Sequence, residues 1–134
     1  MFKNFKRLSV VVLVSTISFN IAYADDYMPP DKFKDPVKQF AFVKQSERDA
    51  ETGWAEYKLG LYYETGYGVK KDISKAYAWY QCSSVNDFTL GVNAFKKLTD
   101  SMSKEQIAAG KKAYNKIVSN MLSQNSKDVN NTEF

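Results

Sequence analysis

The stretch LGLYYETGYGVKKDISKAYAWY, residues 59–80, decides the fold of this chain. Its tyrosines, tryptophan and three glycines fit either an aromatic ligand site beside a phosphate-binding loop or the interior of a helical hairpin. A phosphate-binding loop follows a strand and leads directly into a helix, whereas these glycines follow a segment with helical character. Asp72, which is placed to begin the next helix, would also repel a phosphate group. The context therefore favours a turn between two helices.

Both sides of this glycine turn carry helix signals. Residues 54–64 predict one helix and residues 73–84 predict a second. Gly66 is placed to end the first helix in a left-handed conformation, which glycine adopts without a steric penalty. Asp72 is suited to accept hydrogen bonds from the free amide groups that begin the second helix. The stretch is therefore expected to form a helical hairpin.

The hairpin also contains the residues needed to pack its two helices together. Gly60 and Ala76 are small, so the two backbones can approach closely where they cross. Tyr63, Trp79 and Tyr80 supply the bulk that fills the layer between the helices. Most aromatic residues of the stretch are therefore expected in the core.

Three further helices are expected outside the hairpin. One covers residues 36–50, with Asp35 as its N-cap and Pro36 at its first position. Another covers residues 88–100, and the last covers residues 104–123. No segment alternates apolar and polar residues cleanly enough to form a strand. The predicted fold is all-α, with about five helices.

The first 24 residues are expected to be an export signal. Basic residues are followed by a short apolar run and then by the small-residue site Ala22-Tyr23-Ala24, which predicts cleavage after Ala24. The apolar run is too short to span a bilayer, and no later stretch is apolar enough. We therefore expect a periplasmic protein without membrane insertion after cleavage, with secretion as the alternative.

The helical domain is expected to span residues 35–123. Residues 25–34 contain two adjacent prolines and predict an extended lead-in. Ser103 with Gln106 fits a capping box that opens the last helix. Residues 124–134 are polar and predict a flexible tail.

Composition argues against nucleic-acid binding and against catalysis. The formal net charge of +4 falls to +1 when Lys3, Lys6 and Arg7 leave with the signal peptide. Such a domain lacks the strongly basic character typical of proteins that bind phosphate backbones. The chain has no histidine, which is the usual acid–base residue near neutral pH. We therefore expect no enzyme, no cofactor and no metal site.

Cys82 is the only cysteine of the chain. A single thiol forms neither an internal disulfide nor a thiolate zinc site. A small buried thiol near a helix end is favoured over a reactive or intermolecular one.

The hairpin resembles a known family, the Sel-one-like repeats, which are related to the tetratricopeptide repeat. The matching unit covers residues 55–84, and residues 88–123 resemble the closing helices of such arrays. The resemblance implies a short helical-hairpin solenoid, an α–α superhelix, whose first helices line a concave surface that holds a partner protein. The positions that carry the resemblance are Ala55, Tyr57, Leu59, Gly60, Tyr63, Gly66, Gly68, Val69, Asp72, Lys75, Ala76, Trp79 and Tyr80.

One face of the helix over residues 54–64 is the first candidate surface for binding a partner. Trp54, Tyr57, Leu61 and Glu64 recur at spacings of three and four and therefore share a face. The alternative is that neighbouring helices simply cover this stripe, and the sequence does not separate the two.

The tip of the glycine turn is the second candidate surface. Tyr67 lies at the tip, where it is not easily part of the core, and is the better candidate for an exposed contact. Lys70 and Lys71 beside it could steer an acidic partner toward this end of the domain.

Exported proteins that resemble this family include immunity proteins, which neutralise toxic effectors. The resemblance therefore implies a partner protein, and more specifically an immunity protein that occludes a toxic effector. A scaffold or assembly adaptor of the cell envelope is the alternative. Cell-wall hydrolysis is a second alternative, but the relatives proposed to have it carry a disulfide in each repeat, whereas this chain has one cysteine. A homo-oligomer is compatible with the sequence but not required by it.

Overall fold

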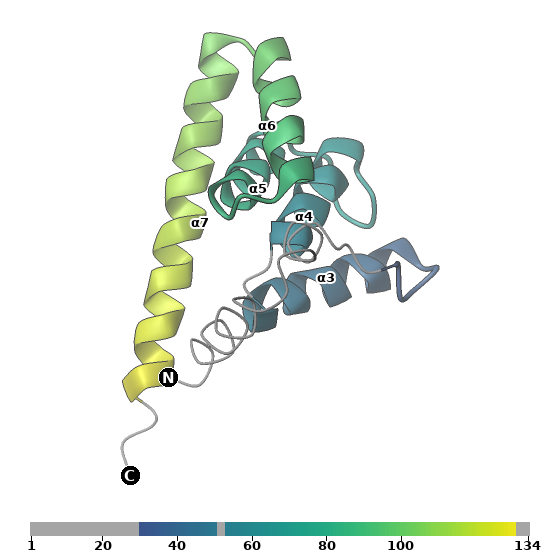
Figure 1. Ribbon diagram of the computed structural model, residues 1–134, viewed down its shortest axis with the longest axis vertical. Coiled ribbons are helices and arrows are strands. Elements are labelled where there is room, and N and C mark those ends of the chain that lie inside the picture. Colours follow the sequence, from purple (N-terminus) through teal and green to yellow (C-terminus); the bar gives the residue numbers. More distant parts are fainter. Residues whose placement is uncertain (1–29, 51–52, 131–134) are drawn as a thin grey trace, which may run out of the picture.

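The computed structural model describes residues 30–50 and 53–130, which form five helices and contain no strand. The predicted all-α fold is confirmed for this part of the chain. The expected signal peptide lies outside the described residues. Among the helices of the described residues, none is both long and apolar enough to cross a membrane. The helices are α3 (Pro36–Ala50), α4 (Gly53–Thr65), α5 (Ile73–Val85), α6 (Thr89–Ser101) and α7 (Lys104–Asn130) (Figure 1).

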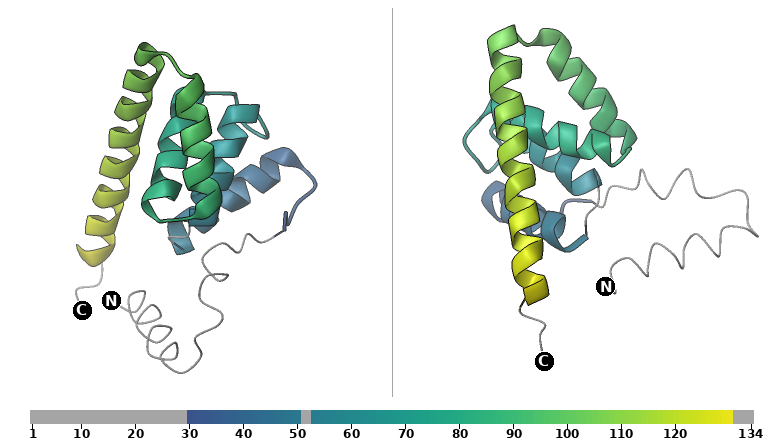
Figure 2. Two further views of the ribbon diagram at one scale, coloured as in Figure 1. Left: turned by 45° about the horizontal axis from the view of Figure 1, so that its top comes forward. Right: turned by 90° about the vertical axis from the view of Figure 1, so that its left-hand side faces the viewer.

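Helix α5 lies at the centre of the molecule, where it packs against α4, α6 and α7. Helix α3, which precedes the hairpin in the chain, packs on α4. Figure 2 shows that α6 and α7 are joined by a tight turn and run in opposite directions. This stacking of successive helices is that of a short helical-hairpin solenoid. The 27 residues of α7 also make it much longer than the 13 residues of α5, so its second half extends beyond α5.

Side-chain caps begin three of the helices at the predicted positions. The carboxylate of Asp35 accepts hydrogen bonds from two amide groups in the first turn of α3, at 2.9 and 3.2 Å. The carboxylate of Asp72 accepts one from the amide of Lys75 at 3.0 Å. Ser103 and Gln106 form the capping box of α7, because each side chain accepts the other residue's amide, at 2.9 and 3.1 Å. These local predictions are confirmed.

The turn between α4 and α5 depends on two glycines with positive φ angles. Gly66 has a φ of 77°, and its amide donates to the carbonyl of Tyr62 at 2.8 Å, which ends α4. Gly68 has a φ of 68°, and a Cβ atom there would lie 2.1 Å from the carbonyl oxygen of Pro36. A helix precedes these glycines, so the turn interpretation is confirmed.

Tyr80 fills the layer between the two helices of the hairpin. Its side chain is 1% exposed, and a Cβ atom on Gly60 would lie 2.4 Å from its ring. Tyr63 and Trp79 are buried in the same core, and Ala76 is fully buried. The predicted packing of Tyr80 against Gly60 is therefore confirmed, as is the predicted burial of Tyr63, Trp79 and Ala76.

The last helix is longer than predicted. We expected it to end at residue 123, but α7 continues to Asn130. No glycine or proline occurs in residues 111–130, and each residue added to an existing helix contributes one more backbone hydrogen bond. Residues 124–130 are therefore helical, which corrects the predicted tail, and residues 131–134 lie outside the described part of the chain.

Candidate functional site

The predicted stripe on α4 separates into two pairs. The ring of Tyr57 is half-buried, with its centroid 5.9 Å from that of Tyr80, and Trp54 packs against the same core. Leu61 and Glu64, which lie further along α4, border an open groove. The neighbouring helices therefore cover much of one half of the stripe and leave the other half accessible.

Tyr67 is less exposed than predicted. Its side chain is half-buried, and its ring centroid lies 4.9 Å from that of Tyr62. The glycine turn folds back toward the end of α4, so the ring packs against the helix instead of pointing into solvent. Lys70 is exposed, as expected, but the adjacent Lys71 is the lysine that lines the groove.

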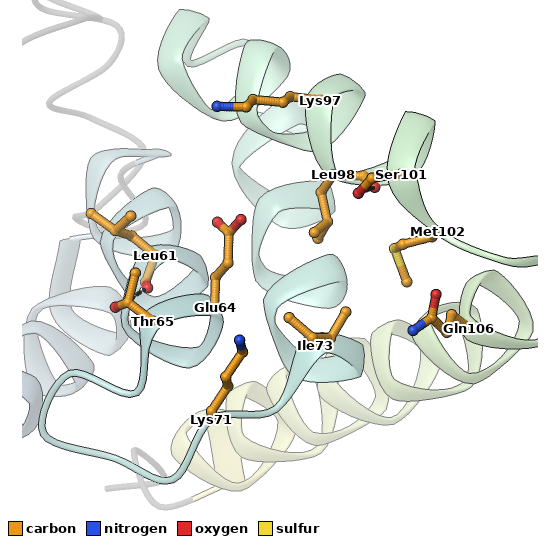
Figure 3. A pocket seen from close by; sticks show the side chains of 10 residues that line it. All are labelled: Leu61, Glu64, Thr65, Lys71, Ile73, Lys97, Leu98, Ser101, Met102 and Gln106. Atoms are coloured by element: carbon orange, nitrogen blue, oxygen red, sulfur yellow. Dashed lines mark hydrogen bonds between the residues drawn. The ribbon is translucent and has the colours of Figure 1, made fainter.

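The groove lies between α4, the beginning of α5 and the junction of α6 with α7 (Figure 3). Its volume is about 690 Å³, and it is open to solvent. Four apolar side chains line it, from three separate parts of the chain. The full lining consists of Leu61, Glu64, Thr65, Lys71, Ile73, Lys97, Leu98, Ser101, Met102 and Gln106.

One acidic and two basic side chains lie at the edges of the groove. Glu64 directs its carboxylate into it, with Lys71 on one side and Lys97 on the other (Figure 3). The hydroxyl of buried Tyr80 donates a hydrogen bond to Glu64 Oε2 at 2.5 Å. Both lysines are exposed, and neither forms an ion pair with an acidic side chain within residues 30–50 and 53–130. The groove therefore combines an apolar surface with charges that remain accessible.

Sequence reasoning missed the part of the groove that lies outside the hairpin. Leu98 and Met102 have the appearance of ordinary core residues, because both follow the apolar spacing of α6. Lys97 and Gln106 look like solvated surface residues. These residues line one site only because α6 stacks beside α4, and that contact leaves no local signal in the sequence.

The hairpin that forms one wall of the groove has a counterpart among known families. A family model described as Sel1 repeat matches residues 55–84, from the first turn of α4 to the end of α5. The chain contains a Sel1 repeat. No curated protein and no solved structure matches it. Sel1 repeats typically mediate protein binding, which indicates that this domain is a protein-binding module.

A partly buried polar cluster joins the lead-in to the Sel1 repeat. Lys58 on α4 is 7% exposed and forms an ion pair with Asp31. The same carboxylate oxygen accepts a hydrogen bond from Gln39 at 3.1 Å, and the hydroxyl of Tyr62 approaches it at 3.5 Å. Burial raises the pKa of Tyr62 to about 12. Three donors from α3 and α4 thus hold Asp31 against the repeat, a contact that sequence reasoning did not predict.

Cys82 is a free thiol buried near the end of the repeat's second helix. Burial, followed by the nearby carboxylates of Glu56 and Glu47, raises the pKa of this thiol to about 12. Because the thiolate is the reactive form, the protonated Cys82 is a poor nucleophile at neutral pH. The buried-thiol interpretation is confirmed. Within the described part of the chain, no group of three His, Cys, Asp or Glu side chains could hold a metal ion.

Proposed function

We propose that this chain is a non-catalytic, periplasmic immunity protein that binds a toxic effector and occludes its active site. The observation that carries the proposal is the groove beside the Sel1 repeat. Its four apolar side chains offer contacts to a partner, and its charged edges can select which partner binds. The expected signal peptide supports export, and the lack of any histidine in the sequence supports a role without acid–base chemistry.

Occlusion requires more contact than the groove provides by itself. Stable protein–protein interfaces bury about 1,200–2,000 Å² in total, whereas a few central residues supply most of the binding energy. We propose that Leu61 and the apolar groove lining form this centre and that the exposed surfaces of α4 and α6 form its rim. An interface of that size can cover the entrance of an enzyme active site.

The first experiment tests the groove as the binding surface. A tagged chain is used to isolate its partner from periplasmic extract, and the purified partner is then titrated calorimetrically with wild type and two variants. Leu61→Glu places a charge in the groove and is expected to weaken binding by about tenfold or more. The matched control Val37→Glu, at a position on α3 that is 63% exposed, is expected to bind like wild type. Equal affinities of both variants would contradict the proposed surface.

The second experiment separates immunity from the scaffold alternative. The partner is directed to the periplasm of a bacterial host with wild type, with Leu61→Glu or alone. An immunity protein predicts growth arrest by the partner alone, relief by wild type and weaker relief by the variant. A partner that is harmless and is encoded among envelope-assembly genes would favour the scaffold. Turnover by the purified chain that is lost in Glu64→Gln would contradict the non-catalytic proposal.

A further inference from the structure

The uncharged polar side chains that line the groove already form hydrogen bonds within the chain, and a free donor group remains among them. The hydroxyls of Thr65 and Ser101 donate to backbone carbonyls of their own helices, at 2.7 and 2.8 Å. The side-chain oxygen of Gln106 accepts the amide of Ser103 at 2.9 Å, which leaves its NH₂ group for another partner. Figure 3 shows this nitrogen on the side of Gln106 that faces the groove. The side-chain NH₂ group of Gln106 therefore offers a partner two N–H donors.

The charged groups of the groove point to the same conclusion. Lys71 and Lys97 carry ammonium groups that form no ion pair within the described part of the chain. Glu64 is the one acidic side chain of the lining, and one of its oxygens already accepts the hydroxyl of Tyr80. The two ammonium groups outnumber the single carboxylate of the lining, so a partner that supplies negatively charged acceptors would gain most from the groove.

We propose that the groove binds an acidic segment of the partner protein in which an apolar side chain lies between carboxylates. This inference rests on the proposed function and specifies the chemistry of the partner. The apolar side chain covers Leu61, Ile73 and Leu98, and the carboxylates on either side of it pair with Lys71 and Lys97. A basic segment of the same shape places like charges beside both lysines and is rejected.

The test uses two fluorescein-labelled synthetic peptides with the same central Leu-Phe pair, flanked by glutamates in one and by lysines in the other. Fluorescence anisotropy at low salt measures their affinity for the full mature chain. The groove variant Lys71→Glu/Lys97→Glu is compared with Lys111→Glu/Lys112→Glu, which reverses two exposed charges on α7 and has the same net charge. Circular dichroism confirms that both variants are folded.

The proposal predicts that wild type and the α7 variant bind the acidic peptide about tenfold more tightly than the basic one, and that the groove variant loses this preference. It also predicts amide shifts around Leu61 and Leu98 in ¹⁵N–¹H spectra.

Equal binding of both peptides, no binding, or equal losses in both variants would overturn the proposal. So would a concentration-dependent dimer that only the groove variant abolishes, because a second copy would then be the occupant. If the natural partner binds the groove variant normally but not Leu61→Glu, the acidic-segment inference fails while the proposed function stands.

Discussion

The hydroxyl of Tyr80, buried between the helices of the Sel1 repeat, donates a 2.5 Å hydrogen bond to the carboxylate of Glu64 at the edge of the groove. One residue thus fills the core of the hairpin and also orients the one acidic group of the groove lining. Burial and the Glu64 carboxylate both raise the pKa of Tyr80 above its ordinary value, so its hydroxyl remains a donor at neutral pH. The repeat core and the candidate binding surface are therefore linked by this contact.

Tyr80→Phe is expected to lower the free energy of unfolding by about 1–3 kcal/mol, because it removes a hydrogen bond to a charged group and keeps the buried ring. Urea denaturation measures the change. Tyr77→Phe is the matched control, since Tyr77 is also buried but its hydroxyl forms no hydrogen bond within the described residues. Equal losses in the two variants would show that the Tyr80–Glu64 bond contributes nothing specific.

Gly60→Ala is expected to destabilise the domain, although the same change inside a helix usually stabilises it by about 1 kcal/mol. A Cβ atom at this position would lie 2.4 Å from the ring of Tyr80, so the two helices must separate. Overpacking of this kind costs about 1–3 kcal/mol. The sign of the change in melting temperature is sufficient to decide, and an increase would contradict the close packing described.

The two turn glycines are expected to differ in their tolerance of substitution. Gly66→Ala introduces only the strain of a positive φ, about 1–2 kcal/mol, because the nearest atoms to its Cβ lie 3.6 Å away. Gly68→Ala adds a clash with the backbone of Pro36 and is expected to be clearly worse. Gly66→Asn should be the mildest of the three, since asparagine accepts this conformation better than alanine. Denaturation midpoints in any other order would contradict this account of the turn.

Stability is expected to fall as the pH rises above about 9. Burial raises the pKa of Cys82 from 9.0 to about 12 and the pKa of Tyr62 from 10.0 to about 12. At a pH between the ordinary and the raised pKa values, the unfolded chain has lost protons that the folded chain retains. The free energy of unfolding therefore decreases as the pH rises. The stability that these two protonated groups contribute is fully present below pH 9 and is lost as the pH approaches 12. Urea unfolding from pH 8 to 11 should show a shallower decline for Cys82→Ala than for wild type, whereas identical slopes would contradict the assignment.

Asp31→Ala is expected to cost about 1–3 kcal/mol, because it leaves the buried ammonium group of Lys58 without its carboxylate. Adding Lys58→Met to this variant should recover part of the loss, since methionine fills similar space without a charge. Asp100→Ala, at an exposed position on α6, serves as the control. If denaturation shows no recovery in the double variant, the loss does not arise from the unpaired lysine.

The sequence predicted the features that depend on neighbouring residues. Asp35, Asp72 and the capping box act within one helical turn, and Gly66 ends a helix through its own backbone angle. The small and bulky residues of the repeat were predictable for the same reason, because their spacing reports which face of each helix is buried. The hairpin and the five-helix fold follow from these local signals.

Contacts between distant parts of the chain were not predictable in this way. Lys58 looks like a solvated helix residue, and only the folded chain places Asp31, 27 residues earlier, beside it. Tyr67 was expected at an exposed tip because the path of the turn back toward Tyr62 cannot be inferred from composition. The groove itself depends on the stacking of α6 beside α4, so sequence reasoning found Leu61 and Glu64 but not Leu98 or Met102.

The most direct test of the proposed binding surface is site-specific photocrosslinking in the periplasm. A benzophenone side chain replaces Lys97 at the groove or, as a control, Lys111 on α7, and the crosslinked product is identified by mass spectrometry. The proposal predicts that position 97 crosslinks to one protein, that this protein also binds the purified chain, and that excess wild-type chain competes for it. Crosslinking of that protein from position 111 and not from position 97 would contradict the groove as the binding surface.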